Sequence, residues 1–176
     1  FNKEERQIHF DGEGYFQVAR NEDCPFRIDA TGLKVEVLGT TFNLDAHREA
    51  ATAELSLEEG SVSFLSTKTG ESVIVEPNQQ VILNQKDGLL TVIKPENIQY
   101  ASAWKRGEFT FEDTTFEEVI QTIEENYHVD IEIDSTLQNL DLFTGTLPVT
   151  DLHEALLIIG KVYGLNAHID GNRITL

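Results

Sequence analysis

The sequence has no methionine, only one cysteine and no long apolar run. With Cys24 alone, a disulfide framework, a CxxC pair and a thiolate metal cluster are all excluded. The longest strongly apolar stretch, residues 156–165, is interrupted by Gly160, Lys161 and Gly164 and is too short to span a bilayer. No signal peptide opens the chain, and position 1 is not methionine. We therefore expect a soluble piece of a longer protein.

Basic side chains are also scarce, because 13 lysines and arginines face 31 acidic residues and give a formal charge of −18. Such a surface repels phosphate backbones, so nucleic acid is a poor partner. A basic protein surface suits it better, although the charge also fits a role in solubility alone. With 176 residues, 40% of them hydrophobic, the chain can bury a core without a metal or a disulfide.

The motifs of common enzymes and cofactor sites are missing as well. Gly12-Glu13-Gly14 resembles the start of a dinucleotide loop, but Gln17 stands where the third glycine is required. The five histidines never form HxH, HxxH or HExxH, and no GxSxG elbow occurs. Adjacent acids such as Glu58-Glu59 and Glu124-Glu125 are best interpreted as solvated faces. We expect no cofactor, no metal site and no enzyme.

What the sequence does contain, from Tyr15 to Ile93, is alternation of apolar and polar residues, separated by turn signals such as Asp87-Gly88. This pattern predicts an all-β sandwich or roll over residues 1–100. The expected strands are Tyr15–Ala19, Phe26–Asp29, Leu33–Val37, Phe42–Ala46, Ala53–Leu57, Ser61–Leu65, Ser72–Val75, Gln80–Leu83 and Leu89–Ile93.

The last part of the chain repeats itself. Shifting Phe111–Ile133 by 36 positions places it on Leu147–Ile169 with the apolar residues in step, first at helical spacing and then in alternation. A duplicated βαβ unit is therefore expected over residues 108–176, after a hinge at 101–107. Together the two parts give a mainly β plus α+β fold. Paired units of this kind are typical of docking modules.

The repeat predicts the individual elements of both copies. Thr114 or Thr115 is expected to cap the first helix and Thr150 the second. The first helix should expose Glu117, Glu118, Glu124 and Glu125. The expected elements are strands at Glu108–Glu112, Val129–Ile133, Leu142–Leu147, Leu165–Ile169 and Arg173–Leu176, with helices ending at Tyr127 and Tyr163. A tight turn at Gly171-Asn172 predicts that the last two strands form a short hairpin.

Exposed strand edges of this repeat are candidate partner sites, and the acidic helix face is an alternative. The edge candidates are Leu142–Leu147 and Arg173–Leu176, with Phe143 and Leu147 equally explained as core. The proposed partner-binding residues are Leu142, Thr144, Thr146, Arg173 and Thr175.

One peptide bond has a chemistry of its own. In a strained Gly39-Thr40 turn the Thr40 hydroxyl could attack the Gly39 carbonyl, and the resulting ester would hydrolyse. The simpler interpretation is that the glycine makes a turn and the threonine suits a strand.

Taken together, these motifs resemble the FecR family of anti-sigma regulators. The resemblance covers Gly12 to Leu176, and its second half looks like the C-terminal domain of many members, akin to the short N-terminal domain of secretins and TonB-dependent receptors. The motifs are GEGYFQVA from Gly12, PFRI from Pro25, VEVLGTTFNL from Val35, LEEGSV from Leu57, PNQQ from Pro77 and WKRGEFTFEDTTFEEVI from Trp104.

The resemblance implies a periplasmic signalling region of a single-pass inner-membrane protein of a Gram-negative bacterium. Its partners would be the signalling domain of an outer-membrane TonB-dependent transporter and, through a cytoplasmic region and a membrane helix expected before Phe1, a sigma factor. In some members the chain cleaves itself at the Gly-Thr bond, here Gly39–Thr40. The family's structural positions would be Gly14, Pro25, Gly39, Gly60 and Trp104.

Three other functions stay open at this point. A glycan-binding cell-surface β-domain would need exposed aromatics, and Trp104 is the only tryptophan. A hydrolase would need two facing carboxylates in one cleft. An assembly subunit of a secretin-like channel would explain the repeat but not the β-rich first half.

Overall fold

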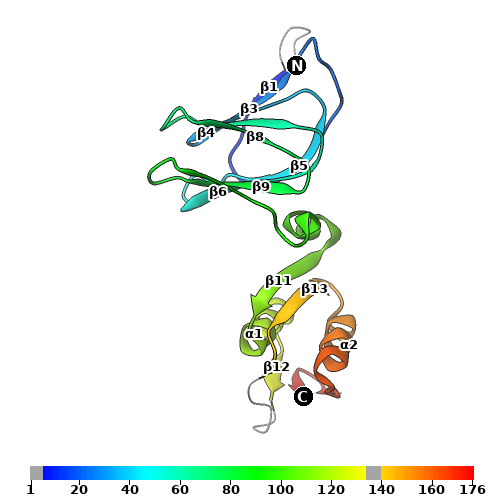
Figure 1. Cartoon of the computed structure of the whole chain (residues 1–176). Coiled ribbons are helices and arrows are strands. Elements are labelled where there is room, and N and C mark those ends of the chain that lie inside the picture. The colour runs from blue at the N-terminus through cyan, green and yellow to red at the C-terminus, as the bar shows by residue number, and fades with distance from the viewer. Residues whose placement is uncertain (1–5, 134–139) are drawn as a thin grey trace. The chain divides into compact units, whose positions relative to one another are not determined.

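The computed structural model describes residues 6–133 and 140–176, and the chain divides into two compact units, Phe1–Ser102 and Ala103–Leu176. The first unit is built mainly of strands, and the second combines strands with two α-helices (Figure 1). This combination confirms the mainly β plus α+β fold class. No helix among the described residues is long and apolar enough to cross a membrane.

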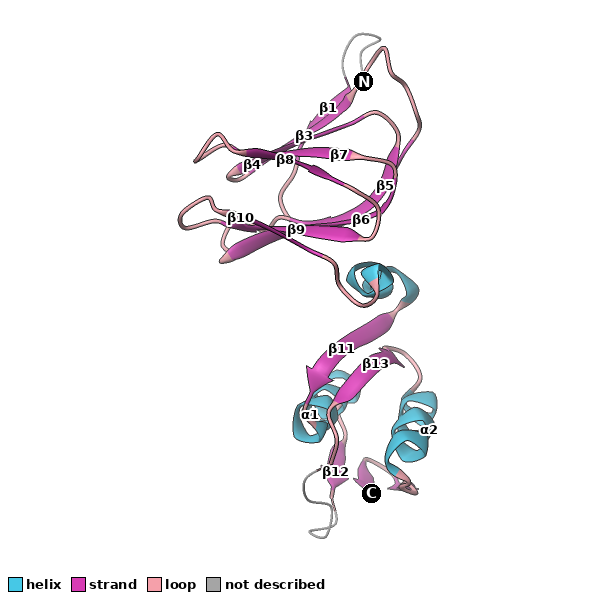
Figure 2. Cartoon of the chain, viewed as in Figure 1, coloured by secondary structure: helices cyan, strands magenta, loops and turns pink. Residues whose placement is uncertain are grey.

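In the first unit, the described strands form two five-stranded sheets that lie face to face (Figure 2). Their orders are β1-β3-β4-β7-β8 and β10-β9-β6-β5-β2. The strands are β1 Arg6–His9, β2 Glu13–Val18, β3 Phe26–Ala30, β4 Leu33–Val37, β5 Thr40–Asp45, β6 Thr52–Glu59, β7 Val62–Ser66, β8 Ser72–Val75, β9 Gln79–Asn84 and β10 Leu90–Ile93.

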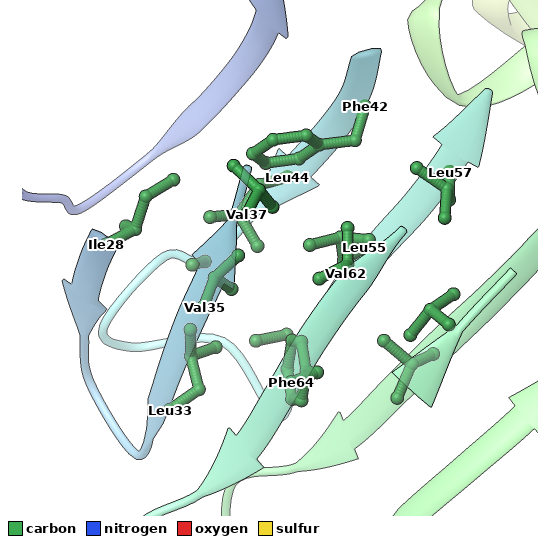
Figure 3. Packing of buried hydrophobic residues seen from close by; sticks show 14 of the residues in the cluster. Ile28, Leu33, Val35, Val37, Phe42, Leu44, Leu55, Leu57, Val62 and Phe64 are labelled. Carbon is green, nitrogen blue, oxygen red and sulfur yellow. The ribbon is translucent and has the colours of Figure 1, made fainter. Parts of the chain in front are cut away.

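Alternation along the strands makes the core of this sandwich. In β4, Leu33, Val35 and Val37 are buried, while the intervening Lys34 and Glu36 are exposed. Side chains from both sheets meet between them, with Phe42 of one sheet and Phe64 of the other fully buried (Figure 3). The predicted β-sandwich is thus confirmed, because period-two patterning buries one face of each sheet.

The sequence pattern did not predict the first strand. The expected strands began at Tyr15, whereas β1 lies before it and pairs in parallel with β3, placing Ile8 opposite Ile28. It is an edge strand whose residues are at most half-buried, so it carries little hydrophobic signal. Arg6 anchors it by donating from Nε to the Cys24 carbonyl oxygen at 2.7 Å.

Residues 101–106, expected to form an irregular hinge, belong to the 3-10 helix η1 (Ile98–Arg106). A 3-10 helix has three residues per turn, which matches neither the 3.6-residue period of an α-helix nor the two-residue period of a strand. A search for those two periods therefore does not find it. Ile98 and Ser102 are buried, which explains why this segment is ordered.

The second unit contains two small sheets. Strand β11 pairs antiparallel with β13, and β15 is the middle strand of the order β12-β15-β14. Two helices and both sheets share one core. The elements are β11 Glu108–Thr114, α1 Phe116–Tyr127, β12 Asp130–Glu132, β13 Phe143–Pro148, α2 Leu152–Tyr163, β14 His168–Asp170 and β15 Arg173–Thr175.

The two helices follow the 36-residue shift at both ends, since Phe116 and Tyr127 correspond to Leu152 and Tyr163. Each helix also ends on a residue in the left-handed region, His128 with φ 57° and Gly164 with φ 71°. The duplication seen in the sequence therefore holds for the bounds and the C-terminal ends of the two helices.

The caps differ between the copies. Thr115 caps α1 in a capping box with Glu118, as one of the two expected alternatives. The expected Thr150 cap of α2 is wrong, because the side chain of Asp151 accepts the hydrogen bond from the Glu154 N–H at 2.9 Å. A carboxylate performs this role as well as a hydroxyl.

The strand after α2 is shorter than the expected Leu165–Ile169 and begins at His168. Leu165 still lies against the last turn of α2, since its N–H donates to the Gly160 carbonyl oxygen at 2.9 Å. Gly160 permits this approach, because a Cβ there would lie 2.7 Å from the Leu165 oxygen.

Candidate functional site

The Gly39-Thr40 bond lies where the chain passes from the end of β4 into β5. A Cβ at Gly39 would lie 2.5 Å from the Cα of Arg20, so no larger residue fits without a backbone shift. Gly39 is not among the described glycines with positive φ. Close packing, and not a left-handed backbone, therefore explains the glycine.

Gly60, between β6 and β7, packs against the same bond. It has φ 95°, and a Cβ there would lie 2.6 Å from the Gly39 carbonyl oxygen. Thr40 is buried beneath this turn, and its Oγ1 donates to the Ser61 carbonyl oxygen at 3.2 Å. The two glycines and the threonine thus form one tightly packed junction between the two sheets' strands.

A hollow of about 510 Å³ opens beside this junction. Glu36 is the one carboxylate among the described residues that line it. Its Oε2 accepts from Arg27 Nε at 2.6 Å, so the carboxylate is held by an ion pair. The geometry accounts for Gly39 and Thr40 structurally, and the described residues that line the hollow offer no carboxylate free of an ion pair beside Thr40.

Glu58, which adjoins this junction in the sequence, is not the solvated surface acid that its pairing with Glu59 suggested. The Tyr15 hydroxyl donates to its Oε2 at 2.7 Å, and the Ser102 hydroxyl donates to its Oε1 at 2.9 Å. It therefore connects β2 and η1 to β6. Only the alternation of β6, which puts Glu54, Ser56 and Glu58 on one face, could have indicated this role.

The expected partner strand at Leu142–Leu147 has mixed exposure. Phe143 and Leu147 are buried, which confirms their interpretation as core, while Leu142 is 55% exposed. Thr144 is exposed but engaged, since its Oγ1 accepts from the Asp113 N–H at 2.9 Å. Thr146 is half-buried. In its two-stranded sheet, β13 pairs on one side only.

The other expected edge, Arg173–Leu176, is not an edge. Strand β15 lies in the middle of its sheet, parallel to β12 and antiparallel to β14. Its backbone is therefore unable to accept a further strand. The side chains of Arg173 and Thr175 are exposed, and Arg173 Nε lies 3.6 Å from the Glu132 carboxylate. The sequence did not reveal that β12 pairs in parallel with the side of this strand that β14 leaves free.

The acidic face of α1 is largely committed to local hydrogen bonds. Glu118 belongs to the capping box, and Glu125 Oε1 accepts from Gln121 at 2.8 Å. Glu124 reaches across to β12, where its Oε1 accepts from the Ile131 N–H at 2.7 Å. These contacts stabilise the helix and its neighbouring strand, and they leave Glu117 as the least constrained acid of the four.

A groove that the sequence did not predict lies between α2 and β14. It has a volume of about 490 Å³ and is lined by Leu157, Gly160 and Lys161 on the helix and by Ala167 and Ile169 on the strand side. Leu157 is 50% exposed and Ile169 is 43% exposed. Leu157 lies outside the buried stripe of α2, and an apolar residue at that position was the sign of the groove that the sequence offered.

Family models match both parts of the chain. The model described as FecR protein matches residues 1–63, and the model described as FecR, C-terminal, matches residues 108–176. The chain belongs to the FecR family. The first match contains the Gly39-Thr40 junction, and the second contains the duplicated unit with its groove. As a FecR-family protein, it is a signalling anti-sigma regulator.

Solved structures agree with this family. Two crystal structures of a proposed anti-sigma factor from Parabacteroides distasonis, at 1.65 Å and 2.50 Å resolution, each give a TM-score of 0.63. Their sequence identities to the FecR-family chain are 27% and 28%. The alignments cover 99% and 100% of this chain and 81% of the other chain in each case. A search of curated protein sequences found no significant match.

Within this FecR-family chain, the described residues contain no group of three or more His, Cys, Asp or Glu side chains arranged to hold a metal ion. The surfaces with an evident potential for recognition are the junction hollow and the groove on α2. Both are lined partly by strand or helix residues and partly by the turns that adjoin them.

Proposed function

We propose that this chain is the periplasmic signalling region of an inner-membrane anti-sigma regulator. It would receive a signal from an outer-membrane TonB-dependent transporter by protein–protein contact and relay it to a cytoplasmic sigma factor. The sigma factor would be bound by a cytoplasmic region outside this chain, connected through a membrane helix. The proposal depends on contact and on no turnover of a substrate.

One observation carries this proposal: both the FecR model and the FecR C-terminal model match the same chain. The second match falls on the duplicated unit, which presents an apolar groove and an edge strand, the features that peptide-binding domains use. The charge of −18 supports a partner surface that is basic overall.

The direct experiment is a calorimetric titration of the chain with the N-terminal signalling domain of the transporter encoded beside it. We expect a one-to-one complex with a dissociation constant of about 10 μM or tighter, near −7 kcal/mol. The signalling domain of an unrelated transporter is the matched control and should give no heat. No binding to the cognate domain at concentrations of about 1 mM would contradict the proposal.

A further inference from the structure

The groove on α2 has two walls of different chemistry. On the helix, Leu157, Lys161 and Gly164 recur at helical spacing and face the groove with Gly160. On the other side, Leu165, Ala167 and Ile169 alternate along the chain into β14. Because β14 is an edge strand, an extended segment lying in the groove can also pair with its backbone.

The first copy of the repeat supplies an internal comparison for this groove. The 36-residue shift places Gln121 where α2 has Leu157, Glu124 where it has Gly160, and Glu125 where it has Lys161. In α1 these side chains are held by hydrogen bonds on the helix surface: Gln121 donates to Glu125, and Glu124 accepts from the Ile131 N–H.

At all three positions the second copy has a different kind of residue, and each difference favours an open binding site. Glycine removes the side chain that would cross the groove, leucine adds exposed apolar surface, and lysine reverses the charge. Close packing against Leu165 accounts for the glycine. It does not require the other two changes, since Leu157 is half-exposed and Lys161 forms no ion pair with any described residue.

Charge singles out the same region. Between Glu154 and Asp170 the sequence has no acidic residue, and Lys161 is the only lysine or arginine there. In a chain with a charge of −18, this is a local patch that is apolar and positive. A segment that fits it has apolar side chains and a carboxylate, because a lysine beside an apolar groove favours an anionic group.

We infer that the α2–β14 groove is the docking site for the signalling partner, and that its occupant is an extended apolar segment carrying a carboxylate that pairs with Lys161. This inference rests on the proposed function and answers which copy of the repeat makes the contact. The second copy binds, while the first copy, with its polar helix face, supports the domain.

The test measures binding of the transporter's signalling domain to single variants of the intact chain. Leu157→Gln and Ile169→Gln change one wall each and should weaken binding about tenfold. Lys161→Glu should weaken it about fivefold, whereas Lys161→Arg should bind like the wild type. Both apolar positions are well exposed, so these variants should fold, which circular dichroism melting verifies.

Val162→Gln is the matched control, because Val162 is on the same helix, is 55% exposed and does not line the groove. It should bind within about twofold of wild type. If wild type binds and all the groove variants bind equally well, the groove assignment is overturned and the proposed function stands. If wild type itself does not bind, both are overturned.

Discussion

Tyr127 and Tyr163 occupy equivalent positions in the two copies of the repeat, and each donates its hydroxyl to a backbone carbonyl some twenty residues away. Tyr127 binds the Pro148 oxygen at 2.5 Å, at the end of β13. Tyr163 binds the Asp141 oxygen at 2.9 Å, just before β13 begins. The last turns of both helices are therefore tied to the two ends of one strand.

Replacing these tyrosines by phenylalanine tests the two ties. Tyr127→Phe and Tyr163→Phe should each lower the free energy of unfolding by about 1 kcal/mol, the usual net value of one hydrogen bond. Urea unfolding followed by the helical circular dichroism signal reports on this unit, since both α-helices lie in it. Stability equal to wild type in both variants would show that neither tie matters.

The same residues predict a loss of stability at alkaline pH. Burial raises the pKa of Tyr127 above its usual 10.0. Burial, followed by the nearby carboxylates of Asp141 and Glu117, raises the pKa of Tyr163 in the same direction. The unfolded chain then loses these protons first, so the stabilisation is complete below about pH 10 and is lost as pH rises further.

The measurement compares wild type with the Tyr127→Phe, Tyr163→Phe double variant in urea at pH 9 and pH 10.5. Lysines titrate in both proteins, so only the difference between them reports on the tyrosines. That difference should shrink at the higher pH. An unchanged difference would contradict the raised pKa values.

The glycine junction predicts a graded series of stability losses. Gly60→Ala introduces both a positive-φ strain and a clash with the Gly39 oxygen, and should cost about 3 kcal/mol. Gly70→Ala is the matched control, since Gly70 also has positive φ, at 76°, with open space around it, and should cost about 1 kcal/mol. Gly39→Ala should cost about 2 kcal/mol through the clash with Arg20 alone. If Gly60→Ala and Gly70→Ala lower the free energy of unfolding equally, the clash with the Gly39 oxygen does not contribute.

The corrected helix cap is tested by two neighbouring substitutions. Asp151→Ala removes the acceptor of the Glu154 N–H and should cost about 1 kcal/mol of unfolding free energy. Thr150→Ala should change it by less than about 0.5 kcal/mol, because Thr150 is exposed and does not cap α2. The reverse order of losses in chemical denaturation would restore Thr150 as the cap.

Self-cleavage between Gly39 and Thr40 stays a prediction. The Thr40 oxygen would attack the Gly39 carbonyl carbon, release the Thr40 amine as an ester forms, and water would then split that ester into a carboxylate and the original hydroxyl. A denaturing gel of the purified protein should show fragments of residues 1–39 and 40–176, which disappear in Thr40→Ala. A single stable band for the wild type would contradict it.

The sequence revealed elements whose pattern is strong and local. Alternation in Leu33–Val37 predicted β4 with its bounds, and helical spacing after Thr115 predicted α1. The repeat placed α2 because the same core positions recur. These predictions succeeded because burial of one face imposes a period on the sequence.

The remainder depends on long-range pairing, which leaves little trace in a local pattern. The Gly171-Asn172 turn predicted the hairpin of β14 and β15, but nothing near Arg173 indicates that β12 pairs with the other side of β15. The groove on α2 likewise arises because Gly160 lets the chain at Leu165 approach the helix, a contact made only after folding. The sequence shows an apolar residue, Leu157, outside the buried stripe of α2, but it does not show which residues lie across the groove from it.

The most direct test of docking through the second copy is a map of backbone amide chemical shifts of the labelled chain on addition of the transporter's signalling domain. We expect the largest changes at residues 157–169, with small changes along α1. Changes confined to α1 or to the β-sandwich, with residues 157–169 unaffected, would contradict docking at the groove.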